Sequence, residues 1–449
     1  MTLTRRDAIF STAALAGGAA LLRGAGDALA SQGSGGTRAW EASYSGSPET
    51  KEPPGLPGKA YRPVVTPNGE ALPFRVVDGV KVFQLVAEEV DHEFAPGLKA
   101  KCWGYNGRVH GPTLEAVEGD HVRVYVTNRL KAPTTIHWHG IYLPSGMDGV
   151  GGLSQKVIQP GETFKYEWTF RQHGTFMYHS HHDEMTQMAM GMMGMIVVHP
   201  RKPAAEYKVD RDFYIMLSEW AIPIGASRPN PNEMTEFNTL TMNARVFPGT
   251  APLVCKKGDR VRVRIGNLSA MDHHPIHLHG HYFKLVATDG GQIPVAGQWP
   301  QTTVLVAVGS TRDIEFIADA PGDWAMHCHM THHVMNQMGH GTPNMTGVDA
   351  SKLDDKTRKL LPGYMTMGQT GMGDMGDMGM PVPKNSIPMS GGNGPFGTIT
   401  MGGIFTILKV REALTSYDGD PGWYQPPAGT VAGPASSEDL KRDGVTVKP

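Results

Sequence analysis

The stretch YNGRVHGPTLEAVEGDHVRVYVTN at residues 105–128 resembles a second stretch, MNARVFPGTAPLVCKKGDRVRVRIGN, at residues 242–267. Both contain an Asn near the start, a Gly-Asp pair in the middle and an Asn at the end. A repeat of this length indicates a duplicated domain. Each copy also contains a segment of alternating residues, HVRVYVTN or RVRVRIGN, and such alternation is typical of a half-buried strand in a β-sandwich.

The repeat continues beyond these two stretches. An HxHG motif follows each copy, at His137 and at His277, and HGTFMYHSHH at 173–182 parallels PGDWAMHCHMTHH at 321–333. Glycine (56 residues) and proline (34 residues) are abundant and separate short runs of β-branched residues. This pattern favours many short strands joined by turns. We therefore expect an all-β chain with two tandem β-sandwich domains.

The most informative chemistry lies in HCHMTHHVMNQM at residues 327–338. A thiolate, two imidazoles and a weak thioether form the ligand set of a blue copper electron-transfer site. Successive side chains on a strand point to opposite faces. Cys328 would therefore hold one copper while its neighbours His327 and His329 reach others.

Further histidines occur in HWHG (His137, His139), HSH (His179, His181) and HPIHLHGH (His274, His277, His279). Together with HCH, these four motifs in this order resemble the multicopper oxidase family over roughly residues 75 to 411. The resemblance implies that each repeat is a cupredoxin-like Greek-key β-sandwich. It also implies a type 1 copper joined to a trinuclear cluster that reduces dioxygen to water.

The resemblance assigns the ligands of four coppers per chain by position. The type 1 ligands would be His274, Cys328 and His333, with Met338 axial. The type 2 copper would be held by His137 and His277, and the type 3 pair by His139, His179, His181, His279, His327 and His329. His332 stands beside His333; the family spacing selects His333 and leaves His332 as the weaker choice.

Asp148 matches the family position of an acidic residue near the type 2 copper, where it would relay protons as a general acid. The alternative is a turn aspartate before Gly149. Ser180 stands where the second repeat has Cys328, and a hydroxyl replaces a copper thiolate poorly. The first domain is therefore expected to lack a type 1 site.

The chain has no room for a third cupredoxin domain between His181 and His274. It resembles the two-domain branch of the family, in which the cluster forms between the first domain of one subunit and the second domain of the next. Head-to-tail contacts of this kind close a ring. We expect a homotrimer.

The expected domains are a signal peptide (1–30), an extension (31–72), a first cupredoxin domain (73–205), a second (206–415) and a tail (416–449). The signal carries Arg5 and Arg6, an apolar run and Ala28–Ala30, as in twin-arginine export, which places the protein in the periplasm or outside the cell. The apolar run is too short to span a bilayer.

An insertion at about 340–400 contains MTMGQTGMGDMGDMGM at 365–380. Thioethers are soft ligands that suit Cu(I), so the run is interpreted as copper capture, with disordered filler as the alternative. The methionines of 185–195 are either a second such cluster or adaptable core packing. Cys102 and Cys255 are either a disulfide or two buried thiols.

The leading function is therefore a laccase-type oxidase that uses dioxygen and a small-molecule or metal-ion reductant: phenols, aromatic amines or Cu(I). A periplasmic copper-binding protein for storage or detoxification is the first alternative. A copper nitrite reductase is disfavoured, because that family keeps its blue copper in the first domain. The net charge of −2, without a basic patch, excludes a nucleic-acid partner.

Overall fold

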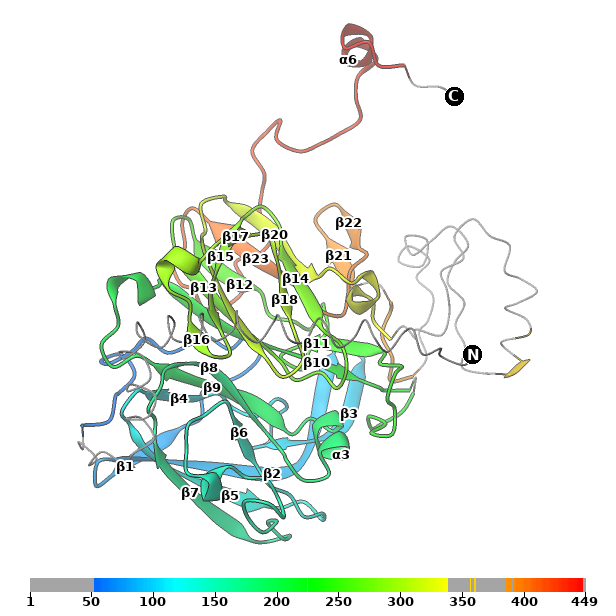
Figure 1. Cartoon of the computed structure of the whole chain (residues 1–449). Helices are drawn as coiled ribbons and strands as arrows, with labels where there is room; N and C mark the ends of the chain where they lie inside the picture. Colours follow the sequence, from blue (N-terminus) through cyan, green and yellow to red (C-terminus); the bar gives the residue numbers. More distant parts are fainter. Residues whose placement is uncertain are drawn as a thin grey trace, which may run out of the picture. The chain divides into compact units, whose positions relative to one another are not determined.

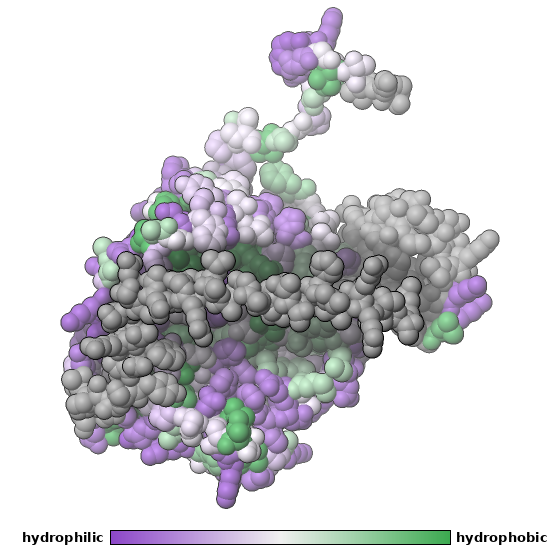
Figure 2. Space-filling view, viewed as in Figure 1, coloured by the Kyte–Doolittle hydropathy of each residue, from purple (hydrophilic) through white to green (hydrophobic). Residues whose placement is uncertain are grey.

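The computed structural model describes residues 52–223, 225–337, 356, 359–360, 384–389 and 391–446. The expected signal peptide, residues 31–51 of the expected extension, Met338 and the methionine run at 365–380 lie outside the described residues. Within the described residues, no helix has both the length and the apolar character needed to cross a membrane. Figure 2 shows hydrophilic side chains over much of the described surface on one face, with hydrophobic residues scattered among them.

The first repeat forms two sheets that face each other (Figure 1). One sheet has the order β1-β2-β5-β7, with β3 also paired to β2. Its strands are β1 (Phe74–Val77), β2 (Val80–Ala95), β3 (Leu98–Tyr105), β5 (His121–Asn128) and β7 (Thr163–Thr169). The other sheet has the order β4-β9-β8-β6. Its strands are β4 (Leu114–Val117), β6 (His137–His139), β8 (Gly174–His179) and β9 (Met193–His199).

The second repeat also forms two sheets. The first has the order β11-β10-β13-β19-β15-β16, with β17 paired to β15. Its strands are β10 (Arg211–Trp220), β11 (Thr239–Met242), β13 (Arg260–Asn267), β15 (Phe283–Thr288), β16 (Gly291–Gln292), β17 (Pro300–Gln301) and β19 (Thr311–Ile317). The second has the order β12-β23-β20-β14-β18. Its strands are β12 (Leu253–Lys256), β14 (His274–Leu278), β18 (Thr303–Val306), β20 (Gly322–Cys328) and β23 (Phe405–Arg411).

Short elements complete the described chain. The α-helices are α3 (Glu184–Ala189) and α6 (Ser437–Arg442), and a small hairpin pairs β21 (Gly392–Gly394) with β22 (Gly397–Ile399). The 3₁₀ turns are η1 (Ser145–Met147), η2 (Ala205–Tyr207), η3 (Val295–Gly297) and η4 (Thr331–Val334). The prediction of an all-β chain with two β-sandwiches is confirmed.

The strand pairing itself is duplicated. β2 and β5 are parallel, as are β10 and β13; β4 and β9 are parallel, as are β12 and β23. β6 pairs antiparallel with β8 in the first repeat, and β14 pairs with β20 in the same way in the second. The repeated sequence therefore encodes the same sandwich twice.

The cores show that the four sheets stack in a fixed order. One apolar core lies between the two sheets of the first repeat, and another lies between the two sheets of the second. A third, rich in methionine, joins β8 and β9 to β10, and its members include Met177, Met193, Met195 and Met216. The β4-β9-β8-β6 sheet thus packs on the β10-containing sheet, and the methionines of 190–195 pack in the core.

This stacking corrects the expectation that RVRVRIGN is a half-buried strand. β5 alternates as predicted, but in β13 every residue after Arg260 is buried. Arg262 and Arg264 lie under the first domain's sheet and pair with carboxylates, because a buried charge must be neutralised. The alternation of charge and apolar side chains marked a strand; it did not mark a solvent-facing side.

Cys102 and Cys255 are both free thiols. Cys102 lies in an apolar cluster where the β2–β3 hairpin meets residues 220–246, whereas Cys255 lies in the core of the second sandwich. Of the two alternatives for this pair, the structure has the buried thiols.

Candidate metal centre

The histidines of each repeat lie at the ends of a matched pair of strands. On β6 and β8, His137 is opposite His179, and the next pair, Trp138 and Tyr178, points to the other face. On β14 and β20, His277 is opposite His327 in the same way. Because side chains alternate along a strand, the histidines point away from the core while their neighbours point into it.

The HCH motif therefore points in two directions. Cys328 is opposite Ile276 and is fully buried in the core of the second sandwich, whereas His327 faces His277 on the other side. Its Sγ lies 3.5 Å from His333 Nδ1 and 3.7 Å from His274 Nδ1. The two Nδ1 atoms are 3.1 Å apart. The expected type 1 ligands thus converge on one point, apart from Met338, which lies outside the described residues.

This geometry fits a bound metal ion. Two imidazole nitrogens held tetrahedrally at about 2.0–2.1 Å from one ion lie about 3.3 Å from each other. The second nitrogen of each ring is occupied: His274 Nε2 lies 2.8 Å from Ser269 Oγ, and His333 Nε2 lies 3.4 Å from Asp272 Oδ2. Such partners fix the ring and leave Nδ1 for the metal.

Burial favours the ligating form of the imidazole. It lowers the pKa of His274 to about 3, so this ring is neutral at physiological pH. Burial also raises the pKa of the Cys328 thiol to about 12, so the thiolate needs a bound cation to form. His332 is exposed, whereas His333 is buried and reaches the sulfur, which favours His333 over the alternative.

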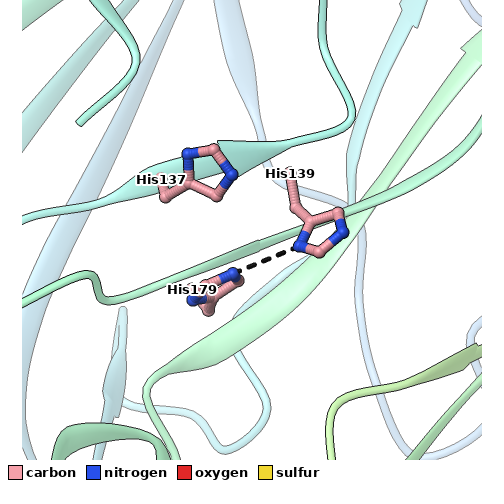
Figure 3. A group of neighbouring side chains, drawn as sticks. All are labelled: His137, His139 and His179. Carbon is pink, nitrogen blue, oxygen red and sulfur yellow. Dashed lines mark hydrogen bonds between the residues drawn. The ribbon is translucent and has the colours of Figure 1, made fainter. Parts of the chain in front are cut away.

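The first repeat gathers four histidines at the edge of its sheet. Figure 3 shows His137, His139 and His179 turned toward one another, with His139 Nδ1 3.3 Å from His179 Nε2. The ring of His181 lies 5.5 Å from that of His137. Burial lowers the pKa of His179 to about 3. These four residues are called the first half-site below.

Backbone carbonyls set the tautomers of the first half-site. The Nδ1–H of His137 donates to the Asp148 carbonyl at 2.8 Å, and that of His179 donates to the Ser180 carbonyl at 2.8 Å. A carbonyl can only accept, so Nε2 of each ring keeps its lone pair for a metal. Glu184 adds a carboxylate 3.5 Å from His179 Nδ1.

The second repeat gathers the other four histidines, the second half-site. His279 Nε2 lies 3.1 Å from His327 Nε2, and the ring of His329 lies 5.6 Å from that of His277. His277 Nδ1 donates to the Thr302 carbonyl at 2.7 Å. His327 Nδ1 donates to the Cys328 carbonyl at 2.7 Å, so the peptide of the thiolate also orients a cluster histidine.

The two half-sites remain separate in the chain. Among the residues that the structure describes, ring contacts join histidines within each half-site and none joins one half-site to the other. The first half-site lies on the β4-β9-β8-β6 sheet, and the second lies on the sheet of β14 and β20. The β10-containing sheet stands between them.

The first repeat fills the place of the type 1 site with neutral polar groups. Thr134 and Ser180 occupy the positions of His274 and Cys328, and both are fully buried. Their hydroxyls donate to Gln187 Oε1 at 2.7 and 2.5 Å. This closed hydrogen-bonded set offers neither a thiolate nor an imidazole, in keeping with the expectation of no type 1 copper there.

Sequence reasoning missed several partners of these histidines. Ser269, Asp272 and Thr302 hold ligating rings, and Gln187 closes the site in the first repeat. They come from loops and from α3, and no motif marks them. Asp148 was predicted for its carboxylate, which lies 3.4 Å from His137 Nδ1, but its carbonyl makes the shorter contact.

Asp148 is also the turn residue that was the alternative interpretation, because it directly follows η1 and precedes Gly149, whose φ is +90°. A side chain at Gly149 would collide with the Ile136 carbonyl beside His137. The turn therefore brings residue 148 against the ligand strand.

Comparisons with known proteins identify the family of this chain. Family models described as multicopper oxidase match residues 87–203 and 223–346, together more than half of the chain. Copper resistance protein A of Escherichia coli is 30% identical over 243 residues, covering 43% of this chain and 40% of that protein. An L-ascorbate oxidase of Brassica rapa subsp. pekinensis is also 30% identical, over 46% of this chain and 42% of its own length.

The match thus spans less than half the length of these curated relatives. A larger overlap is found with the solved blue copper oxidase from Nitrosomonas europaea, which is 28% identical with a TM-score of 0.55 and covers 73% of this chain and 85% of that one. The two sandwiches, the convergent ligand sets and these matches together show that the chain belongs to the multicopper oxidase family.

Proposed function

We propose that this protein is a copper oxidase that takes single electrons from a reductant at one site and reduces dioxygen to water at another. The observation that carries the proposal is the two-sided HCH segment. Cys328 meets His274 and His333 in the core, while His327 joins the second half-site on the opposite face. Bound copper would supply one-electron redox chemistry at the first site and four-electron reduction of dioxygen at the second.

The protein's own groups prepare both sites. Burial around Cys328 excludes water from the thiolate, and carbonyls hold the cluster imidazoles in one tautomer before any metal binds. Because His327, Cys328 and His329 are consecutive, a single backbone segment connects the two sites. A copper-storage protein or a copper carrier would not need such a connection.

The separation of the half-sites supports a homotrimer in which each chain supplies ligands for four coppers. Stacked sheets lie about 10 Å apart, so two sheets with a third between them are roughly 20 Å apart. Imidazoles that share a cluster bind their metals at about 2 Å, so one chain cannot bring its own half-sites together. Head-to-tail subunits would join the first half-site of one chain to the second half-site of the next, and three such contacts would close a ring.

Asp148 is the proposed proton relay. Its carboxylate is about one-third exposed and lies beside His137, so it has access both to water and to the first half-site. Four-electron reduction of dioxygen consumes four protons, and an acidic side chain at this place would deliver them by general acid chemistry.

The proposed reductants are phenols, aromatic amines or Cu(I). Relatives named copper resistance protein A and laccase support these classes without choosing between them. The methionine run at 365–380 would favour Cu(I), because thioethers are soft ligands. Export by the twin-arginine route would place the enzyme in the periplasm or outside the cell.

The test compares the copper-loaded protein with Cys328→Ser, and uses Cys102→Ser, a buried thiol in a different core, as the matched control. The parent and the control should bind four coppers per chain, show an intense blue band and consume dioxygen. Cys328→Ser should lose the blue band and the oxygen consumption. Retention of both would refute the proposal, and variable copper content without oxygen consumption in the parent would favour a storage protein.

A further inference from the structure

Five tyrosine and tryptophan side chains form a continuous cluster in the core of the first sandwich. The ring centroid of Trp138 lies 5.0 Å from that of Trp168, 5.4 Å from that of Tyr166 and 6.2 Å from that of Tyr178. Tyr178 in turn lies 5.4 Å from Tyr105. All five side chains are at most 3% exposed.

This aromatic cluster lies directly behind the first half-site. Trp138 stands between His137 and His139 on β6, and Tyr178 immediately precedes His179 on β8. The two aromatic residues are opposite each other in the strand pair and point into the core, while the histidines point away from it. Each side chain is therefore attached to the same short backbone segment as the cluster ligands.

The second repeat provides an internal comparison, because it has the same sandwich with a different core. Its strand pair β14–β20 places Leu278 opposite Met326, where β6–β8 places Trp138 opposite Tyr178. By the same alignment, Met242, Ile314 and Phe316 stand at the positions of Tyr105, Tyr166 and Trp168. The fold therefore packs well without a single indole or phenol at these five positions.

The aromatic cluster also carries unpaired polar atoms. The indole nitrogens of Trp138 and Trp168 and the hydroxyl of Tyr105 are buried, with no hydrogen-bond partner in the described part of the chain. Buried Trp and Tyr side chains usually find a partner, and an unpaired buried donor lowers stability. Phenylalanine would avoid that loss, so packing alone does not explain these residues, whereas a redox role would.

The indoles are better suited than the phenols to lose an electron here. A phenol that is oxidised must release its proton, and the Tyr178 hydroxyl donates to the weakly basic Pro112 carbonyl at 2.8 Å. Within the described residues, the hydroxyls of Tyr105 and Tyr166 have no hydrogen-bond partner. An indole can lose one electron and keep its N–H proton, so the absence of an acceptor does not block its oxidation.

We propose that Trp138, supported by Trp168, is an auxiliary one-electron donor to the dioxygen-reducing cluster. The inference rests on the proposed function and adds an electron source to it. When dioxygen has received only three of its four electrons, the Trp138 indole supplies the fourth and becomes a radical cation that Trp168 shares. Oxygen is thereby reduced fully to water with four protons from solvent, and one electron from the reductant later restores the indole.

The experiment uses the full-length, copper-loaded protein, reduced with fewer electrons than four per chain and mixed with dioxygen before rapid freezing. Electron paramagnetic resonance should show a narrow organic radical beside the broad copper signals. Protein grown with ring-deuterated tryptophan should give a narrower radical signal, whereas ring-deuterated tyrosine should leave it unchanged. Trp138→Phe should abolish the radical, and Trp168→Phe should lower its yield.

The matched control is Trp220→Phe, a buried tryptophan in a different cluster whose indole donates to Thr241 Oγ1 at 3.1 Å; it should keep the radical. Copper content and the blue band show whether each variant is intact. If Trp138→Phe loses copper, the radical yield of Trp168→Phe tests the inference instead. The inference is overturned if the parent shows no organic radical, if tyrosine labelling narrows the signal, or if Trp168→Phe leaves the yield unchanged. Oxygen consumption without a radical would refute this inference alone, whereas failure to bind copper and consume oxygen would refute the proposed function.

Discussion

The separation of the two half-sites makes a complementation experiment decisive. One variant carries His137→Ala and His139→Ala and so lacks the first half-site; the other carries His277→Ala and His279→Ala and lacks the second. Each substitution removes an imidazole at a strand end that does not lie in an apolar core, so the sandwich should survive. Alone, each variant should be inactive, because every cluster in its ring lacks ligands.

Co-expressed in equal amounts, the two variants should recover part of the activity. A cluster is intact only where two intact half-sites meet. Its first half-site must come from the variant with His277→Ala and His279→Ala, and its second half-site must come from the variant with His137→Ala and His139→Ala. Each condition holds with a probability of one half, so about one quarter of the clusters should be complete, whatever the size of a closed ring. Clusters built within one chain would give none, because every chain carries a damaged half-site.

The assay is oxygen consumption per total copper-loaded subunit, measured on rings purified through two different affinity tags, one on each variant. Over all randomly mixed rings the rate should be about one quarter of the parent rate, and in the doubly tagged trimers it should be about one third, because selection removes rings of a single variant and each mixed trimer has one complete cluster of three. Two tagged copies of the same variant provide the control and should stay inactive. Doubly tagged rings that bind copper and remain inactive would refute the assembly of the cluster between subunits, and with it the roughly 20 Å separation derived from the sheet order.

Three further predictions concern other parts of the molecule. Asp148→Asn should lower turnover without changing copper content, and unaltered turnover would remove this carboxyl from proton delivery. Arg264→Met should lower the unfolding free energy by about 3–5 kcal/mol, measured by denaturant titration, because it leaves Asp212 short of a buried partner. Burial alone would raise the pKa of Asp212, but Arg264 and Arg262 hold it below its ordinary value, so this contribution is present at neutral pH and should be lost as the pH falls through the acid range. Deletion of 365–380 should weaken Cu(I) oxidation and spare oxidation of an organic dye; equal loss of both would argue against copper capture.

The local sequence was sufficient for the strands and for the pairing of ligands within a motif. Alternation along HVRVYVTN predicts the alternating burial of β5, and the same rule separates Cys328 from His327 and His329. These features depend only on the two-residue period of a strand, which each segment carries by itself. The second sandwich could be predicted as well, because the second repeat carries the same local patterns as the first.

Burial of β13, the partners of the ligands and the distance between the half-sites depend on the tertiary structure. RVRVRIGN has the pattern of a half-buried strand, yet the neighbouring domain covers Arg262 and Arg264 and supplies Thr175 at the junction. Asp272 and Thr302 reach their histidines from loops whose paths no local pattern fixes.

The sequence by itself thus determined which donor atoms each motif offers to a metal, because donor chemistry and strand period are local properties. Only the stacking of four sheets decided that the two sets of histidines point to different places, because that order arises from contacts between residues far apart in the chain.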